Sequence, residues 1–240
     1  MINSVQQATS VVCQKKISIL KYAVPIIVVT LLFARLCPAQ IQFARTYGGV
    51  SRDWSNSVIQ TTDGGYVIAG YTESFGAGSE DLLLIKLNYF GSVQWAKAVG
   101  GIYSDYGYSV IQTTDGGYAM TGYSFSFSTG DRVLFLVKLS SSGSLDWAKA
   151  VGGRHNDYGY SIIQTSDSGY IIAGCANGCA LFLVKFSYTG SMQWAKAVGG
   201  TDYDISYSVV QTTDGGFAAA GYTNSYGAGS RDLFLLKFKF

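Results

Sequence analysis

A carboxylate and an aromatic ring recur side by side along the chain. Four times, a Gly-Gly pair is followed after three residues by an aspartate, and in three of these copies the next residue is Trp or Tyr. Carboxylate oxygens bind cations such as Ca²⁺, and a flat ring beside a hydrogen-bonding carboxylate suits a sugar. The candidate ligand-binding residues are Asp53, Trp54, Asp105, Tyr106, Asp157, Tyr158 and Asp204.

A structural role is the alternative for both residue types. An aspartate at the end of a loop can accept hydrogen bonds from backbone N–H groups, and it would then recur because the loop recurs. The rings of the same segments would pack between repeats, together with Tyr108, Tyr160, Tyr203 and Tyr207. A second set of aspartates lies in tight turns, where we expect turn stabilisation only: Asp63, Asp115, Asp167 and Asp214.

The sequence shows no recognisable catalytic set. His155 is the single histidine, and it occurs in one copy of the repeated loop. A metal centre would need further ligands at defined spacing, a nucleophile a positioned base, and a glycosidase a distinct pair of carboxylates. We therefore expect no enzyme, no catalytic residue, no cofactor and no dedicated metal site.

Two cysteines lie four residues apart in the third copy of the repeat, Cys175 and Cys179. The loop that holds them is about five residues shorter than its counterpart in the first copy. In an exported protein, a disulfide across the Asn177-Gly178 turn would staple this loop. Two free thiols, or a metal site, are the alternatives.

An internal repeat of about 50 residues determines where all these side chains stand. The string Ser-Val-Ile-Gln-Thr-Thr-Asp-Gly-Gly-Tyr and its variants occupy residues 57–66, 109–118, 161–170 and 208–217. Four copies fill the chain after its leader, at about 43–95, 96–147, 148–194 and 195–240, and together they predict a single domain over residues 40–240.

Each copy reads as four β-strands, at residues 57–61, 66–72, 81–87 and 93–99 in the first copy. An Asp-Gly pair between two β-rich runs predicts a hairpin. The third strand is apolar on both faces, and the fourth alternates like an outer edge strand. Trp95, Trp147 and Trp194 in the fourth strands are expected to pack between units.

Four-stranded antiparallel units at this period are typical of a β-propeller, so we predict an all-β propeller of four blades. Residues 42–47 resemble a fourth strand, and the last copy stops within its third strand. Pairing of these two segments would close the ring, with Asp53 and its equivalents near one mouth of the channel. An open arc of a larger propeller is the alternative.

The combined motif resembles the repeats of large secreted bacterial and archaeal β-propeller proteins. The likeness rests on Gly-Gly-x3-Asp, on the string described above, on Asp-x-Leu-x-x-Lys-Leu and on Trp-Ala-Lys, and it covers residues 41–240. These proteins include the secreted seven-bladed propeller (SBBP) and delta-60 repeat families, with a more distant similarity to NHL repeats. The resemblance implies export, surface display and a binding or scaffolding role.

Residues 1–39 have the composition of a secretory signal peptide. Three lysines precede an apolar run of about 13 residues, and Cys37-Pro38-Ala39 offers a cleavage site after Ala39. An uncleaved membrane anchor is the alternative. Four of the 17 basic residues and none of the 15 acidic ones fall in this segment, so the remaining chain has a net charge of −2, which does not favour nucleic-acid binding.

These features predict a secreted or cell-surface protein with an extracellular partner. The favoured function is a non-catalytic binding or scaffold module that takes an unknown protein or glycan. The alternative is a carbohydrate-binding propeller with one shallow site in each blade.

Cleavage of the leader is directly testable. We expect exported protein to begin at or near Gln40, because the charged, apolar and small-residue regions occur in the order that a signal peptidase reads. The intact mass of protein recovered from the medium measures this. Recovery of exported protein that still carries Met1 would support the membrane anchor instead.

Overall fold

The structure is a computed structural model that describes residues 42–177 and 180–239. The chain divides into two compact units, Met1–Tyr47 and Gly48–Phe240. The predicted signal peptide lies outside the described residues. In the part of the first unit that is described, residues 42–47, no residue belongs to a strand.

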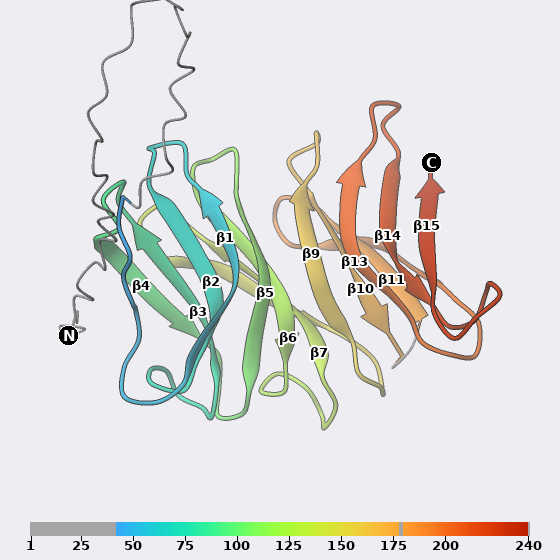
Figure 1. Ribbon diagram of the computed structural model, residues 1–240, viewed down its shortest axis with the longest axis horizontal. Coiled ribbons are helices and arrows are strands. Elements are labelled where there is room, and N and C mark those ends of the chain that lie inside the picture. The colour runs from blue at the N-terminus through green and yellow to red at the C-terminus, as the bar shows by residue number, and fades with distance from the viewer. Residues whose placement is uncertain (1–41, 178–179, 240) are drawn as a thin grey trace, which may run out of the picture. The chain divides into compact units, whose positions relative to one another are not determined.

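The second unit consists of antiparallel β-sheets, and the part of the chain that the structure describes contains no helix (Figure 1). Within each sheet, strands that follow one another in the sequence are hydrogen-bonded neighbours. The first sheet holds β1 (Asp53–Gln60), β2 (Tyr66–Thr72), β3 (Asp81–Leu87) and β4 (Val93–Val99). The second holds β5 (Asp105–Gln112), β6 (Tyr118–Ser124), β7 (Val133–Leu139) and β8 (Leu145–Val151). The third holds β9 (Tyr158–Gln164), β10 (Tyr170–Ala176), β11 (Ala180–Phe186) and β12 (Met192–Val198), and the fourth holds β13 (Asp204–Gln211), β14 (Phe217–Thr223) and β15 (Asp232–Phe238).

The predicted hairpin turns are confirmed. Gly64, Gly116 and Gly215 adopt φ near +80°, a conformation that a residue without Cβ reaches at little cost. The third copy has Ser168 at this place, with φ of 64°. In all four turns the aspartate Oδ1 accepts the N–H of the glycine two residues later, which is the structural role expected for these aspartates.

The innermost strand of the first sheet is longer than predicted. It begins at Asp53 and not at Ser57, because a bulge between Ser55 and Ser57 lets a segment with few apolar residues stay paired with β2. The same shift recurs in the other three sheets, at 107/109, 159/161 and 206/208. As a consequence, Asp53, Asp105 and Asp204 are the first residues of strands.

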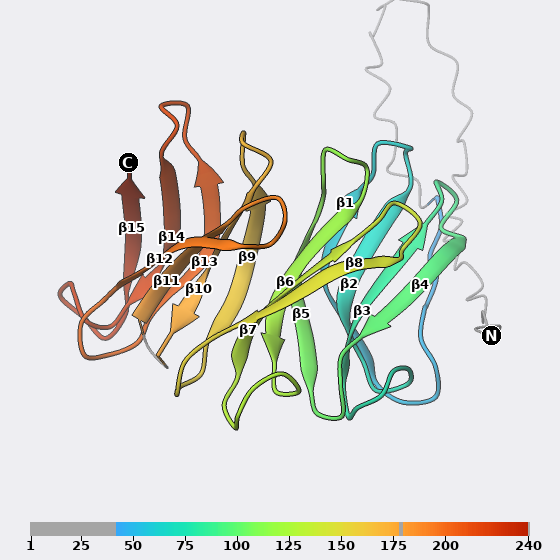
Figure 2. The ribbon, with the colours of Figure 1, turned by 180° about the vertical axis from the view of Figure 1, so that it is seen from behind.

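The sheets of the second unit lie side by side in chain order, with their innermost strands adjacent (Figures 1 and 2). The main contacts between sheets join successive ones, β1 with β5, β5 with β9 and β9 with β13. An apolar core fills each of these three junctions. The tryptophans of the outer strands pack across them as predicted, for example Trp95 against Tyr118 with ring centroids 5.6 Å apart.

The predicted closed ring of four blades is wrong. The sheets form an open series, the fourth sheet has three strands among the described residues, and residues 42–47 are not a strand. Val58 on the first sheet and Leu233 and Leu235 on the fourth are exposed, by 64%, 85% and 67%. The repeat fixes how one sheet packs on the next, but this local rule does not bring the first and last sheets together.

Buried lysines connect the third strands to the hairpin turns. Lys86, near the end of β3, is 3% exposed, and its Nζ lies 2.8 Å from Asp63 Oδ2 and 3.0 Å from the Leu87 carbonyl oxygen. Lys138 and Lys185 repeat this arrangement with Asp115 and Asp167. The Lys86 ammonium, with help from Thr61, lowers the pKa of Asp63 to about 2.

These ion pairs predict that the stability of the fold depends on pH. They also predict that substitutions of the two partners differ in their cost to stability. The pKa of Asp63 is lower in the folded state, so its stabilisation is complete above about pH 4 and is lost as the pH falls towards 2. Asp63→Asn strands a buried ammonium and should cost about 1–3 kcal/mol. Lys86→Met removes the charge and should stay within about 1 kcal/mol of the parent protein.

Chemical denaturation at pH 7 and pH 3 measures these differences. Lys237→Met is the matched control, because the Lys237 side chain pairs with Asp214 but is 55% exposed. If Asp63→Asn and Lys86→Met destabilise the protein equally at pH 7, burial of the ammonium is not the controlling cost.

Candidate functional site

The aspartates that end the four Gly-Gly loops accept hydrogen bonds from those same loops. They are Asp53, Asp105, Asp157 and Asp204. Asp105 Oδ2 accepts the N–H of Gly101 at 2.8 Å and the hydroxyl of Ser126 at 2.7 Å. Asp204 makes the equivalent pair of bonds with Gly200 and Ser225. Asp53 binds Gly49 and Ser74 in the same way, and Asp157 accepts the N–H groups of Gly153 and Asn177.

This bonding places the carboxylates away from solvent. Asp105, Asp157 and Asp204 are at most 3% exposed, and Asp53 is half-buried. Each carboxylate links the Gly-Gly loop to the loop after the second strand of the same sheet. The structure therefore gives these aspartates the loop-closing role that the sequence left as an alternative, and it does not bring the four together around a shared ligand position.

One pair of carboxylates lies close together at the junction of the first and second sheets. A Cβ placed on Gly100 would clash with both Asp81 Oδ1 and Asp105 Oδ2, so both carboxylates border this glycine. Within the described residues, the Oδ1 atoms of Asp81 and Asp105 are buried and accept no hydrogen bond. Burial and the charge of Asp105 raise the pKa of Asp81. No group of three or more metal-ligating side chains occurs in the described ranges.

The aromatic residues beside the aspartates are mostly packed in a row along the innermost strands. The Tyr106 ring stacks on Tyr123 at a centroid distance of 4.8 Å and lies 4.3 Å from Tyr71. Tyr158 and Tyr160 stack at 5.7 Å, and Tyr160 continues to Tyr108 and Tyr207. Burial raises the pKa of both Tyr108 and Tyr160.

Charged side chains hold this row of rings between sheets. The Glu80 carboxylate accepts hydrogen bonds from the hydroxyls of Tyr106, at 2.9 Å, and Ser104. Arg132 occupies the corresponding position of the second sheet, donates to the Tyr158 hydroxyl at 2.7 Å and lies over the Phe125 ring. Trp54 is different, because its side chain is 62% exposed on the first sheet.

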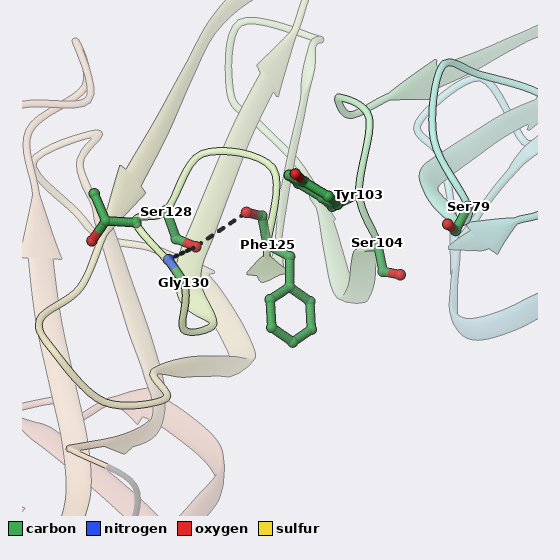
Figure 3. Close-up of a pocket in the computed structure, with 7 residues that line it drawn as sticks. Ser79, Tyr103, Ser104, Phe125, Ser128 and Gly130 are labelled. Atoms are coloured by element: carbon green, nitrogen blue, oxygen red, sulfur yellow. Dashed lines mark hydrogen bonds between the residues drawn. The ribbon is translucent and has the colours of Figure 1, made fainter.

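A pocket of about 530 Å³ opens beside these loops, between the first two sheets (Figure 3). The loop after β2 supplies Ser79, the Gly-Gly loop before β5 supplies Tyr103 and Ser104, and the loop after β6 supplies Phe125 and residues 128–130. The rings of Tyr103 and Phe125 lie between Ser79 on one side and Ser128 on the other (Figure 3). The lining thus combines flat rings with hydroxyl groups.

Hydrogen bonds fix the shape of this pocket. Ser128 Oγ donates to the Phe125 carbonyl at 3.1 Å and accepts the N–H of Gly130 at 3.3 Å (Figure 3). The N–H of Tyr103 is held by Ser126 Oγ at 3.0 Å, which in turn binds Asp105. Asp105 therefore helps to position Tyr103 through Ser126, although Asp105 does not itself line the pocket.

Comparisons with known proteins identify no family. No family model matches the sequence, and no curated protein matches it. Among solved structures, the chain is similar to a protein of unknown function from Bacteroides caccae, with 11% identity and a TM-score of 0.46. The match covers 69% of this chain and 52% of the other, so this chain spans about half the length of that protein. A likeness at this level carries no argument about function.

The pocket-lining residues were not among the sequence candidates. Tyr103, Phe125 and Ser128 lie in loop positions that differ between the four copies, whereas the candidates came from positions that recur. In a repeat protein the recurring residues maintain the repeat, so the variation between copies is the signal that points to these loops. His155 lies in one such loop and is exposed.

The predicted disulfide falls partly outside the described residues, which include Cys175 but not Cys179. Cys175 is buried at the end of β10, and the disulfide stays a prediction. The membrane anchor, the alternative for residues 1–39, also lies outside the described residues. In the described part of the chain, no helix is long and apolar enough to cross a membrane.

The two carboxylates beside Gly100 should respond oppositely to substitution. Asp81 has a raised pKa, so burial of its charge costs stability at pH 7, and Asp81→Asn should raise the melting temperature by a few degrees. Asp105→Ala removes the acceptor of Gly101 N–H and Ser126 Oγ and should cost about 1–3 kcal/mol.

Thermal melts at pH 7 and pH 4.5 provide the measurement. The gain from Asp81→Asn should shrink at the lower pH, where the Asp81 carboxyl takes up a proton more readily in the folded state than in the unfolded state. A loss of stability in Asp81→Asn at pH 7 would show that the ionised carboxylate is needed there.

Proposed function

We propose that the chain is an open arc of β-propeller blades that serves as an exported, non-catalytic binding module. The observation that carries this proposal is the pocket between the first two sheets, where three loops meet on rigid strands. Binding sites are commonly placed on loops that a stable scaffold holds in position. In this arrangement each four-stranded sheet is a blade, and β1, β5, β9 and β13 line the inner side of the arc.

The export and the surface location rest on the sequence of residues 1–39 and on the resemblance to secreted propeller repeats. A scaffold role is compatible with the same architecture, because a series of blades presents a long row of loops to a partner. The pocket favours a more specific role.

A carbohydrate is the ligand class that the pocket lining favours. Sugar rings present C–H faces that stack on aromatic rings and hydroxyls that exchange hydrogen bonds with polar side chains. Tyr103 is 58% exposed, and its ring stands near Phe125 and the hydroxyls of Ser79 and Ser104. Ser and Thr hydroxyls both donate and accept, which suits a neutral polar ligand. We therefore propose a neutral glycan as the ligand, with the first two blades forming its site.

Glycan binding can be measured on an array of oligosaccharides and then by calorimetry with the strongest binder. We expect saturable binding that Tyr103→Ala weakens about tenfold, equivalent to about 1.4 kcal/mol, because the ring is an exposed face of the pocket. Tyr188→Ala is the matched control, since Tyr188 is 66% exposed in the turn between β11 and β12.

Tyr106→Ala is a poor test of binding, because its ring is packed against Tyr71 and Tyr123. Binding that is lost in Trp54→Ala and retained in Tyr103→Ala would place the ligand on the first sheet. A protein that binds no oligosaccharide on the array would rule out the carbohydrate role and leave a protein partner.

A further inference from the structure

The innermost strand of the first sheet exposes a position that the following sheets bury at their junctions. Val110, Ile162 and Val209 are 2%, 3% and 3% exposed, because each lies on an innermost strand against the preceding sheet. Their equivalent in β1 is Val58, which is 64% exposed. On β1 the first sheet therefore exposes an apolar residue that is buried at each of the three junctions, although Leu83, Ile85 and Leu87 on β3 of this sheet are buried.

The fourth sheet exposes the opposite surface. On β3, Leu82 and Leu84 are fully buried under the second sheet, and the equivalent leucines of β7 and β11 are fully buried too. On β15 the equivalents are Leu233 and Leu235, which are 85% and 67% exposed. The burial pattern of β15 alternates between exposed and half-buried residues, whereas every residue of β3 and β7 is buried.

A series of hydrogen bonds links each sheet to the next. At its two ends, one donor and one acceptor have no neighbouring sheet to bond with among the described residues. The N–H of Thr62 donates to Gln112 Oε1 at 2.8 Å, and Thr114 and Ser166 donate in the same way to Gln164 and Gln211. The next donor in this series is the N–H of Thr213 on the fourth sheet, and the acceptor that begins it is Gln60 Oε1 on the first. Within the described ranges, no following sheet supplies a glutamine to Thr213 and no preceding sheet supplies a donor to Gln60.

Loop glycines and charged residues also make contacts between successive sheets that are missing at the two ends of the series. A Cβ on Gly78 would clash with the carbonyl oxygen of Gly101 on the next sheet, whereas its equivalent Gly229 has no atom within 4 Å among the described residues. Arg231 is the equivalent of Arg132 and lies over the Tyr222 ring at 4.7 Å. Arg132 also reaches Tyr158 on the next sheet, and the residue equivalent to Tyr158 on the first sheet is the exposed Trp54.

We propose that a second copy of this chain docks head to tail, with its first sheet on the fourth sheet of its partner. This contact would repeat the junction that the chain already forms three times between its own sheets. Val58 and the leucines of β15 would share one apolar core, Thr213 N–H would donate to Gln60 Oε1, and the Arg231 guanidinium would lie over the Trp54 ring. The inference does not depend on the carbohydrate site.

Two copies suffice to close such an assembly. The described part of the chain has one face of each kind, so two copies can form both contacts at once around a twofold axis. The ring would then hold eight blades, within the usual range of four to eight for propellers. Closure between two chains differs from the closure of a single chain, which the structure excludes.

A groove lies between β15 and the outer strand β12. It has a volume of about 210 Å³ and is lined by Leu236 and Phe238 of β15 and by Lys196, Ala197 and Val198 of β12.

Analytical ultracentrifugation of the purified protein tests the proposal. We expect a dimer, and we expect Val58→Asp and Leu235→Lys each to raise its dissociation constant at least about tenfold. Both side chains are exposed in the single chain, so neither substitution should prevent folding, which circular dichroism checks. Leu145→Lys is the matched control, because Leu145 is 47% exposed on the outer strand β8, away from both faces.

Mixing the two charged variants tests the head-to-tail arrangement. A mixed pair has one junction of parent sequence and one in which the carboxylate introduced by V58D faces the ammonium introduced by L235K. We therefore expect the mixture to dimerise more tightly than either variant alone. A monomeric parent protein, or a mixture that associates no better than its components, would overturn the proposal. An open-ended filament would overturn the closed pair.

Discussion

The third strand of each repeat is apolar on both faces, and the arrangement of the molecule depends on this constraint. A strand such as β3 cannot bury both faces within its own sheet, so burying such a strand completely requires a cover on each side of the sheet. The second sheet meets this need with the first and the third, and its strands β6 and β7 are buried throughout. Each fully buried leucine contributes about 1.5–3 kcal/mol, which makes stacking of the sheets the main source of stability.

Much of this fold could be predicted from the sequence. The turns, the order of strands and the packing of Trp95, Trp147 and Trp194 follow from a motif that recurs four times. The burial of Lys86 and its equivalents was not predicted, although a lysine recurs at this position of the third strand in every copy. A charge in an apolar strand is recognisable as buried only when its partner is known, and the partner lies across the hairpin.

Two features could not be predicted from the repeat. Whether the series closes depends on the angle between successive sheets, and no single residue encodes that angle. The pocket could not be predicted for a different reason. Asp105 and Tyr106 recur because they hold the loop and the row of rings, while the pocket is built by Tyr103 and Phe125, whose positions vary between copies.

The nearest-neighbour packing of the sheets has a consequence for how the protein opens. A sheet with two neighbours loses two interfaces when it unfolds, and a sheet at the end of the series loses one. Local unfolding should therefore begin at an end and spread inward as a front. The fourth sheet has fewer strands among the described residues and an exposed β15, so its amide protons would exchange fastest with solvent, and those of β6 and β7 slowest. Stability would then vary along the chain as a gradient, and a probe placed at one end would report an unfolding transition different from that at the centre.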